Sequence, residues 1–80
     1  MAAARITLFT RPGCHLCDTA REVVHAVAEE CAVGVQEIDI TTDPDLLAKY
    51  WDQIPVTLVD GQPHDVFFVD AERLRQALTS

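Results

Sequence analysis

The sequence predicts one α/β domain over residues 1–80, with the element order β-α-β-α-β-β-α and a four-stranded mixed sheet flanked by helices. Three observations predict this class. Short runs of β-branched and aromatic residues alternate with segments whose apolar residues recur every three or four positions. The apolar fraction of 49%, with only three glycines and four prolines, is typical of a compact chain. A chain of 80 residues can bury one hydrophobic core, so we expect no second domain.

The chain is predicted to begin with a strand followed by a long helix. Residues 5–10 (Arg-Ile-Thr-Leu-Phe-Thr) are rich in strand-forming residues, and the turn signal Pro12-Gly13 follows them. From Cys17 to about Val33-Gly34, the apolar residues have the spacing of an amphipathic helix. They are Ala20, Val23, Val24, Val27, Ala28 and Cys31. We expect Cys31 to pack within this stripe as a small apolar residue.

A second strand and a second helix are predicted next. Residues 35–40 (Val-Gln-Glu-Ile-Asp-Ile) alternate apolar and polar side chains, as in a strand with one buried face. Asp43 can cap a helix whose first residue is Pro44, because the N–H that proline lacks would be unpaired there. This helix is predicted to end near Trp51. Tyr50 and Trp51 are expected to cover the sheet edge near the following proline loop, with a place in a binding groove as the alternative.

Two antiparallel strands and a last helix complete the predicted domain. The apolar runs 56–59 and 66–69 can pair across a turn that contains Asp60-Gly61. Asp70 can cap a final helix over residues 71–79. The apolar face of this helix consists of Ala71, Leu74, Ala77 and Leu78. A right-handed crossover between the first two strands then produces the mixed sheet.

The chemistry of the chain is expected at Cys14 and Cys17, which stand one helical turn apart at the start of the first helix. At that separation two cysteines can exchange between dithiol and disulfide with little backbone movement. The start of a helix is electropositive and stabilises a thiolate, so Cys14 is the predicted nucleophile. Cys17 lies further inside the helix and is the predicted resolving thiol. Zinc ribbons use the same spacing, but they need a second cysteine pair that this sequence lacks, so we predict no metal site.

The run from Leu8 to Cys17 (Leu-Phe-Thr-Arg-Pro-Gly-Cys-His-Leu-Cys), together with Ile54-Pro55-Val56 and the element order, resembles the glutaredoxin branch of the thioredoxin superfamily. It is similar in particular to the short bacterial glutaredoxin-like proteins with a Cys-His-Leu-Cys centre. The resemblance extends over essentially the whole chain and implies a thioredoxin-like fold of the glutaredoxin type. It also implies that Pro55 follows a cis peptide bond and faces the two thiols. The backbone of Ile54 would then pair with the bound substrate.

The same resemblance implies how a glutathione moiety would be held. Arg11 matches the basic residue three positions before the nucleophile, and Asp70 could either meet the glutathione amine or only cap the last helix. After Phe67-Phe68 this chain reads Val69-Asp70-Ala71-Glu72, without the Gly-Gly pair of glutaredoxins. Glutathione and a thioredoxin reductase are therefore both candidate electron donors. His15, between the cysteines, is expected either to tune the redox potential or to be merely solvated.

The predicted activity is the reduction of protein disulfides or glutathione mixed disulfides, without a bound cofactor. A net charge of −7 argues against nucleic acid as a partner. Residues Met1 to Ala4, which precede the first strand, are too few for an export signal or a membrane anchor, so we expect a cytoplasmic protein with no membrane partner. We also expect it to be a monomer. Two alternatives are a metal or iron-sulfur carrier that uses Cys14 and Cys17 with ligands from a partner, and a redox-silent docking domain.

Overall fold

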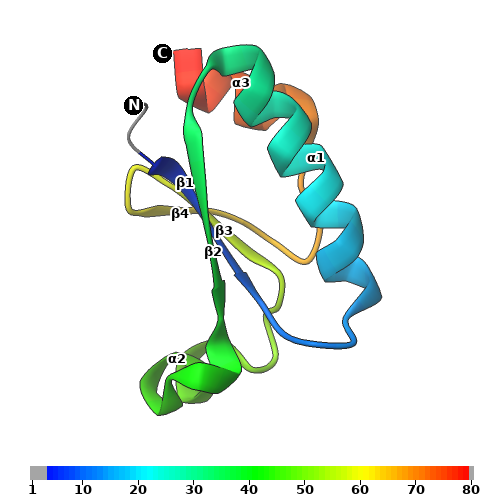
Figure 1. Ribbon diagram of the computed structural model, residues 1–80. Helices are drawn as coiled ribbons and strands as arrows, with labels where there is room; N and C mark the ends of the chain where they lie inside the picture. The colour runs from blue at the N-terminus through cyan, green and yellow to red at the C-terminus, as the bar shows by residue number, and fades with distance from the viewer. Residues whose placement is uncertain (1–3, 80) are drawn as a thin grey trace.

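The computed structural model describes residues 4–79 and contains the predicted order of elements (Figure 1). The elements are β1 (Ala4–Thr10), α1 (His15–Cys31), β2 (Gly34–Asp39), a 3-10 turn (Ile40–Thr42), α2 (Pro44–Tyr50), β3 (Val56–Val59), β4 (Gln62–Val66) and α3 (Ala71–Thr79). The strand order in the sheet is β2-β1-β3-β4. Strands β1 and β2 are parallel, and the β1/β3 and β3/β4 pairs are antiparallel. The predicted four-stranded mixed sheet is therefore confirmed.

Helices α1 and α3 lie together on one face of the sheet, whereas α2 lies at one end of the sheet (Figure 1). The larger apolar cluster fills the space between the sheet and the two packed helices. Its buried members are Ile6, Leu8, Ala20, Val24, Val27, Ala28, Val59, Leu74 and Leu78. Cys31 is half-buried and packs against this cluster, as its position on the apolar stripe predicts. Burial of this face accounts for the helical spacing of apolar residues in α1.

A second apolar cluster lies where β1 and β3 meet the start of α1. It contains Phe9, Cys17, Ile40, Ile54 and Val56, all buried. Tyr50, at the end of α2, stacks on Phe9 with 4.8 Å between the ring centroids. Because α2 has no buried residue of its own, this contact and the packing of the half-buried Leu46 attach the helix to the sheet.

The helix ends follow from local chemistry. Cys14 is the N-cap of α1, and Asp43 caps α2 by accepting hydrogen bonds from the N–H groups of Asp45 (2.9 Å) and Leu46 (3.4 Å). Helix α1 ends at Cys31 rather than near residues 33–34, because Ala32 adopts a left-handed conformation with φ of 56°. Its N–H group then reaches back to carbonyl groups of the last turn and closes the helix.

The predicted position of the last strand, residues 66–69, is wrong. Strand β4 spans Gln62–Val66 instead, because the hairpin turn consists only of Asp60 and Gly61, which have positive φ values of 51° and 80°. The strand can therefore start immediately after the turn. Pro63 is tolerated within it because β4 lies at the edge of the sheet, where a missing N–H removes no hydrogen bond from the ladder. Phe67, with φ of 66°, lies beyond the end of the strand.

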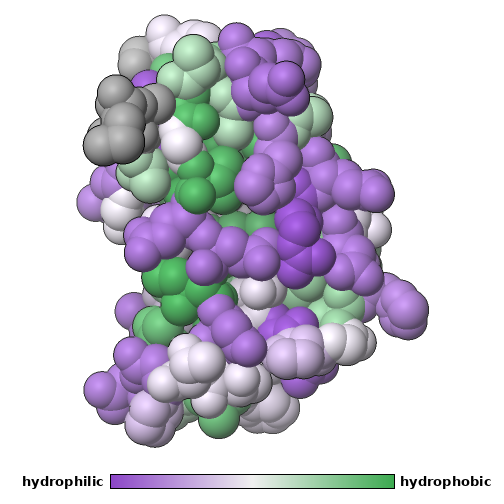
Figure 2. All heavy atoms as spheres, in the orientation of Figure 1, coloured by the Kyte–Doolittle hydropathy of each residue, from purple (hydrophilic) through white to green (hydrophobic). Residues whose placement is uncertain are grey.

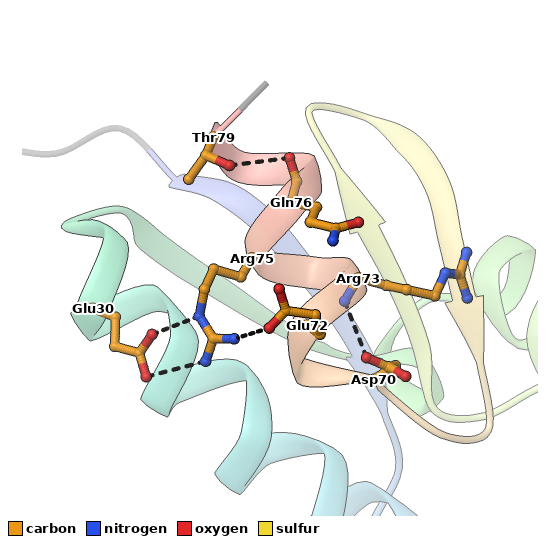
Figure 3. A network of polar contacts seen from close by, with 7 residues as sticks. All are labelled: Glu30, Asp70, Glu72, Arg73, Arg75, Gln76 and Thr79. Atoms are coloured by element: carbon orange, nitrogen blue, oxygen red, sulfur yellow. Dashed lines mark hydrogen bonds and ion pairs between the residues drawn. The ribbon is translucent and has the colours of Figure 1, made fainter.

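Polar contacts connect the two packed helices (Figure 3). The guanidinium of Arg75 in α3 donates to both carboxylate oxygens of Glu30 in α1, at 2.8 and 3.3 Å, and to Glu72 at 2.6 Å. Hydrophilic side chains cover most of the outer side of α1, on the right of the space-filling view (Figure 2). No helix within residues 4–79 is long and apolar enough to cross a bilayer.

Candidate active site

The two cysteines lie at the start of α1, directly after the turn that follows β1. Cys14 is half-buried, and its Sγ accepts a hydrogen bond from the backbone N–H of Cys17 at 3.2 Å. This places the sulfur at the electropositive end of a 17-residue helix. Gly13 has φ of 75°, a conformation that glycine adopts without steric cost, and it directs the chain from the strand into the helix. The position therefore suits a sulfur that reacts as a thiolate.

The second cysteine is in a different environment. Cys17 is 1% exposed and packs within the second apolar cluster. Burial raises the pKa of Cys17 to about 11, and the hydrogen bond with the Cys14 thiol acts in the same direction. The backbone N–H of Arg11 and the positive charge of Arg21 favour the Cys17 thiolate, but they do not outweigh burial. Cys17 is therefore a protonated thiol at neutral pH.

A groove of about 420 Å³ opens beside Cys14. Its lining residues are Arg11, Gly13, Cys14, His15, Leu16, Trp51, Asp52, Ile54 and Phe67. Three of the predicted substrate-contacting residues, Arg11, His15 and Ile54, thus lie together at the predicted nucleophile. Trp51 lines the groove as well, which was the alternative expectation for it.

Pro55 and Asp70 are not among the residues that line the groove. The peptide bond between Ile54 and Pro55 is cis, as predicted, and Pro55 is fully buried with its carbonyl oxygen accepting from the N–H of Phe67 at 2.8 Å. Asp70 does not line the groove. Its Oδ1 accepts from the N–H of Arg73 at 3.0 Å, so it caps α3 as predicted (Figure 3).

In the described part of the chain, Arg11 differs from the other arginine and lysine side chains in having no partner. The side chains of Arg5, Arg21, Arg73 and Arg75 form ion pairs, and Lys49 lies over the ring of Tyr50. Among the arginine and lysine side chains within residues 4–79, Arg11 is thus the one with neither an ion pair nor a ring contact. Asp18, which directly follows Cys17, pairs with Arg21 at 2.8 Å, so its charge is partly offset near the helix start.

Leu16, Asp52 and Phe67 also line the groove, and sequence reasoning missed them. Phe67 was assigned to a strand, although the two-residue turn Asp60-Gly61 already allows β4 to end before it. Metal ligands do not gather anywhere in the described part of the chain: residues 4–79 contain no group of three or more histidine, cysteine or acidic side chains that could hold an ion.

Four features together define a protein of the thioredoxin superfamily. They are the crossover from β1 through α1 to β2, the antiparallel β3/β4 hairpin, the cis Pro55 and the cysteine pair at the start of α1. Within that superfamily, the chain belongs to the glutaredoxin-like domain family (DUF836), whose family model matches residues 5–79. This membership indicates a redox-type function.

The chain is also similar to individual proteins and to a solved structure. An uncharacterised protein of Mycobacterium tuberculosis is 34% identical over 80 residues, covering 94% of this chain and 82% of that protein. A glutaredoxin-like protein of Dictyostelium discoideum is 34% identical over 75 residues, covering 86% of this chain and 69% of that protein. The X-ray structure of target protein XcR50 from X. campestris matches with a TM-score of 0.74 and 34% identity, covering 92% of this chain and 95% of that one.

Proposed function

We propose that this protein is a dithiol-disulfide oxidoreductase that reduces protein disulfides or glutathione mixed disulfides. The observation that carries the proposal is the asymmetry of the cysteine pair. Cys14 is accessible, with its Sγ at the electropositive start of α1, whereas Cys17 is buried and protonated. This is the arrangement that a nucleophilic and a resolving cysteine require.

The proposed reaction has two steps. The Cys14 thiolate attacks one sulfur of the substrate disulfide, which forms a mixed disulfide, breaks the substrate S–S bond and releases one substrate thiolate that takes a proton from water. Cys17 then loses its proton and attacks the Cys14 sulfur, which closes the Cys14–Cys17 disulfide and releases the second substrate thiol. The substrate gains two electrons, and the protein loses them.

The first step makes deprotonation of Cys17 in the second step easier. The Cys14 thiol raises the pKa of Cys17 both through its hydrogen bond and through its charge. Once Cys14 is part of a mixed disulfide, it carries neither the thiol hydrogen nor the negative charge, so Cys17 loses its proton more readily. Cys17 therefore stays inert until substrate is attached beside it.

Trapping of the intermediate tests the mechanism. In Cys17→Ser, a mixed disulfide with substrate should accumulate at Cys14, whereas Cys14→Ser should abolish exchange; intact-mass spectrometry and insulin reduction measure both. Cys31→Ser is the matched control, because Cys31 packs at the far end of α1, and it should leave exchange unchanged. Equal residual exchange in the Cys14 and Cys17 variants would contradict the assignment.

We propose that glutathione or a thioredoxin reductase is the reductant that regenerates the dithiol. We also propose that the protein is a cytoplasmic monomer that needs no bound cofactor. Arg11 supports glutathione, since an unpaired guanidinium beside Cys14 can donate hydrogen bonds to a carboxylate. Turnover with NADPH, glutathione and glutathione reductase should be compared with turnover with NADPH and thioredoxin reductase. If glutathione is the donor, Arg11→Gln should raise the KM for glutathione several-fold.

A further inference from the structure

We infer that Phe67 determines the specificity of this site, by favouring protein disulfides in which a large apolar side chain adjoins the reacting cysteine. The inference rests on the proposed oxidoreductase function and specifies its substrate class. It starts from the backbone of Phe67, which has φ of 66°. A bulky residue rarely adopts this left-handed conformation, and such outliers concentrate at functional sites.

Hydrogen bonds hold Phe67 in this conformation. Its N–H donates to the carbonyl oxygen of Pro55 at 2.8 Å, and the N–H of Phe68 donates to the carbonyl oxygen of Val66 at 2.8 Å. The ring of Phe67 belongs to neither apolar cluster within residues 4–79 and remains 41% exposed. Core packing therefore does not require this side chain. What the conformation does achieve is to place the ring at the groove beside Cys14.

Apolar side chains from separate elements converge on that groove. Leu16 comes from the first turn of α1, Trp51 follows α2 and Ile54 precedes the cis proline. Trp51 is 60% exposed, although a tryptophan at the surface leaves a large apolar area in water. Together with Phe67 these side chains form an apolar lining directly beside the nucleophile, where a substrate side chain would be removed from water.

The charges and the backbone of the groove favour a polypeptide as the occupant. Arg11 and Asp52 line it with opposite charges, and neither forms an ion pair within residues 4–79, so the lining is close to neutral. The N–H and C=O groups of Ile54 form no backbone hydrogen bond within residues 4–79, so they can pair with an extended segment. Glutathione has a net negative charge and no apolar side chain, so it would leave the apolar lining uncovered.

Two short peptide disulfides provide the test, identical except that leucine or serine stands next to the cysteine. We expect the wild-type kcat/KM to be at least tenfold higher for the leucine peptide, mainly through a lower KM. In Phe67→Gly, which accepts the positive φ and removes the ring, the ratio should fall below threefold, through a loss of kcat/KM for the leucine peptide. Phe67→Leu should retain most of the preference.

Phe68→Ala is the matched control, because Phe68 is more exposed but does not line the groove, and its ratio should equal that of the wild type. Circular dichroism establishes that each variant is folded. The inference would be overturned if the wild-type protein reduced the leucine and serine peptides at equal rates, or if Phe67→Gly kept the wild-type ratio of kcat/KM values. Either result would leave the proposed function intact. Failure of the wild type to reduce any peptide or glutathione disulfide would instead overturn the proposed function.

Discussion

At the scale of single residues, the burial of Cys17 gives a direct chemical prediction. A thiol with a pKa of about 11 has on the order of 100-fold less thiolate at pH 7.5 than an ordinary exposed thiol. Iodoacetamide should therefore alkylate Cys17 at least about 100-fold more slowly than N-acetylcysteine, as peptide mass mapping can measure, and the rate should keep rising up to about pH 11. A rate that levels off near pH 8 would contradict the effect of burial.

Thr57 provides a second prediction for a single side chain. It is 0% exposed, and its Oγ1 has no hydrogen-bond partner within residues 4–79. Since a buried hydroxyl without a partner destabilises the folded state, Thr57→Val should raise the free energy of unfolding by about 1 kcal/mol in urea titrations. The reverse change in the same strand, Val59→Thr, should lower it. A less stable Thr57→Val variant would show that the hydroxyl has a partner after all.

At the scale of elements, the cap of α3 separates two roles of Asp70. Its Oδ1 accepts from the N–H of Arg73 at 3.0 Å, and asparagine can do the same without a charge. We expect Asp70→Ala to lose about 1 kcal/mol of stability in urea titrations and Asp70→Asn to lose almost none. If Asp70→Asn is stable but slower only on glutathione mixed disulfides, the carboxylate also binds the glutathione amine. Equal losses of stability in the two variants would contradict the cap.

At the scale of the whole molecule, Arg5 joins the first strand, the hairpin turn and the last helix. Its guanidinium contacts the carboxylate of Asp60 at 2.7 and 3.0 Å and donates to the carbonyl oxygen of Leu78 at 2.9 Å. These three segments are distant in the sequence. One side chain thus connects both ends of the described chain to the β3/β4 hairpin.

This contact predicts how stability depends on pH. The hydrogen bonds from Arg5 lower the pKa of Asp60, so the ionised carboxylate stabilises the folded state. That contribution is complete above the unfolded-state pKa of about 4 and is lost as pH falls through the lower folded-state pKa. The Tm of wild type should thus exceed that of Asp60→Asn at pH 6, and the difference should vanish toward pH 2. Asparagine tolerates the positive φ at this position, so a difference independent of pH would contradict the ion pair.

Local signals account for the parts of the fold and site that could be predicted from the sequence. The Asp43-Pro44 cap, the apolar stripe of α1 and the spacing of Cys14 and Cys17 depend on neighbours within one or two helical turns. The segment around the cysteines and Ile54-Pro55 also carried the family resemblance. Such short-range patterns act before the rest of the chain is placed, and they predicted the sheet, the helices and the position of the cysteine pair at the start of α1.

Only the tertiary structure decided where the last strand ends and which side chains surround Cys14. An apolar run at residues 66–69 is compatible with a strand or with an exposed loop, and pairing with β3 across a two-residue turn selects the loop for Phe67. Likewise, Trp51, Ile54 and Phe67 reach one groove because the sheet brings distant segments together. The sequence by itself therefore determined the fold and the place of the cysteine pair within it, because both depend on local patterns, whereas long-range packing decided which surface surrounds Cys14.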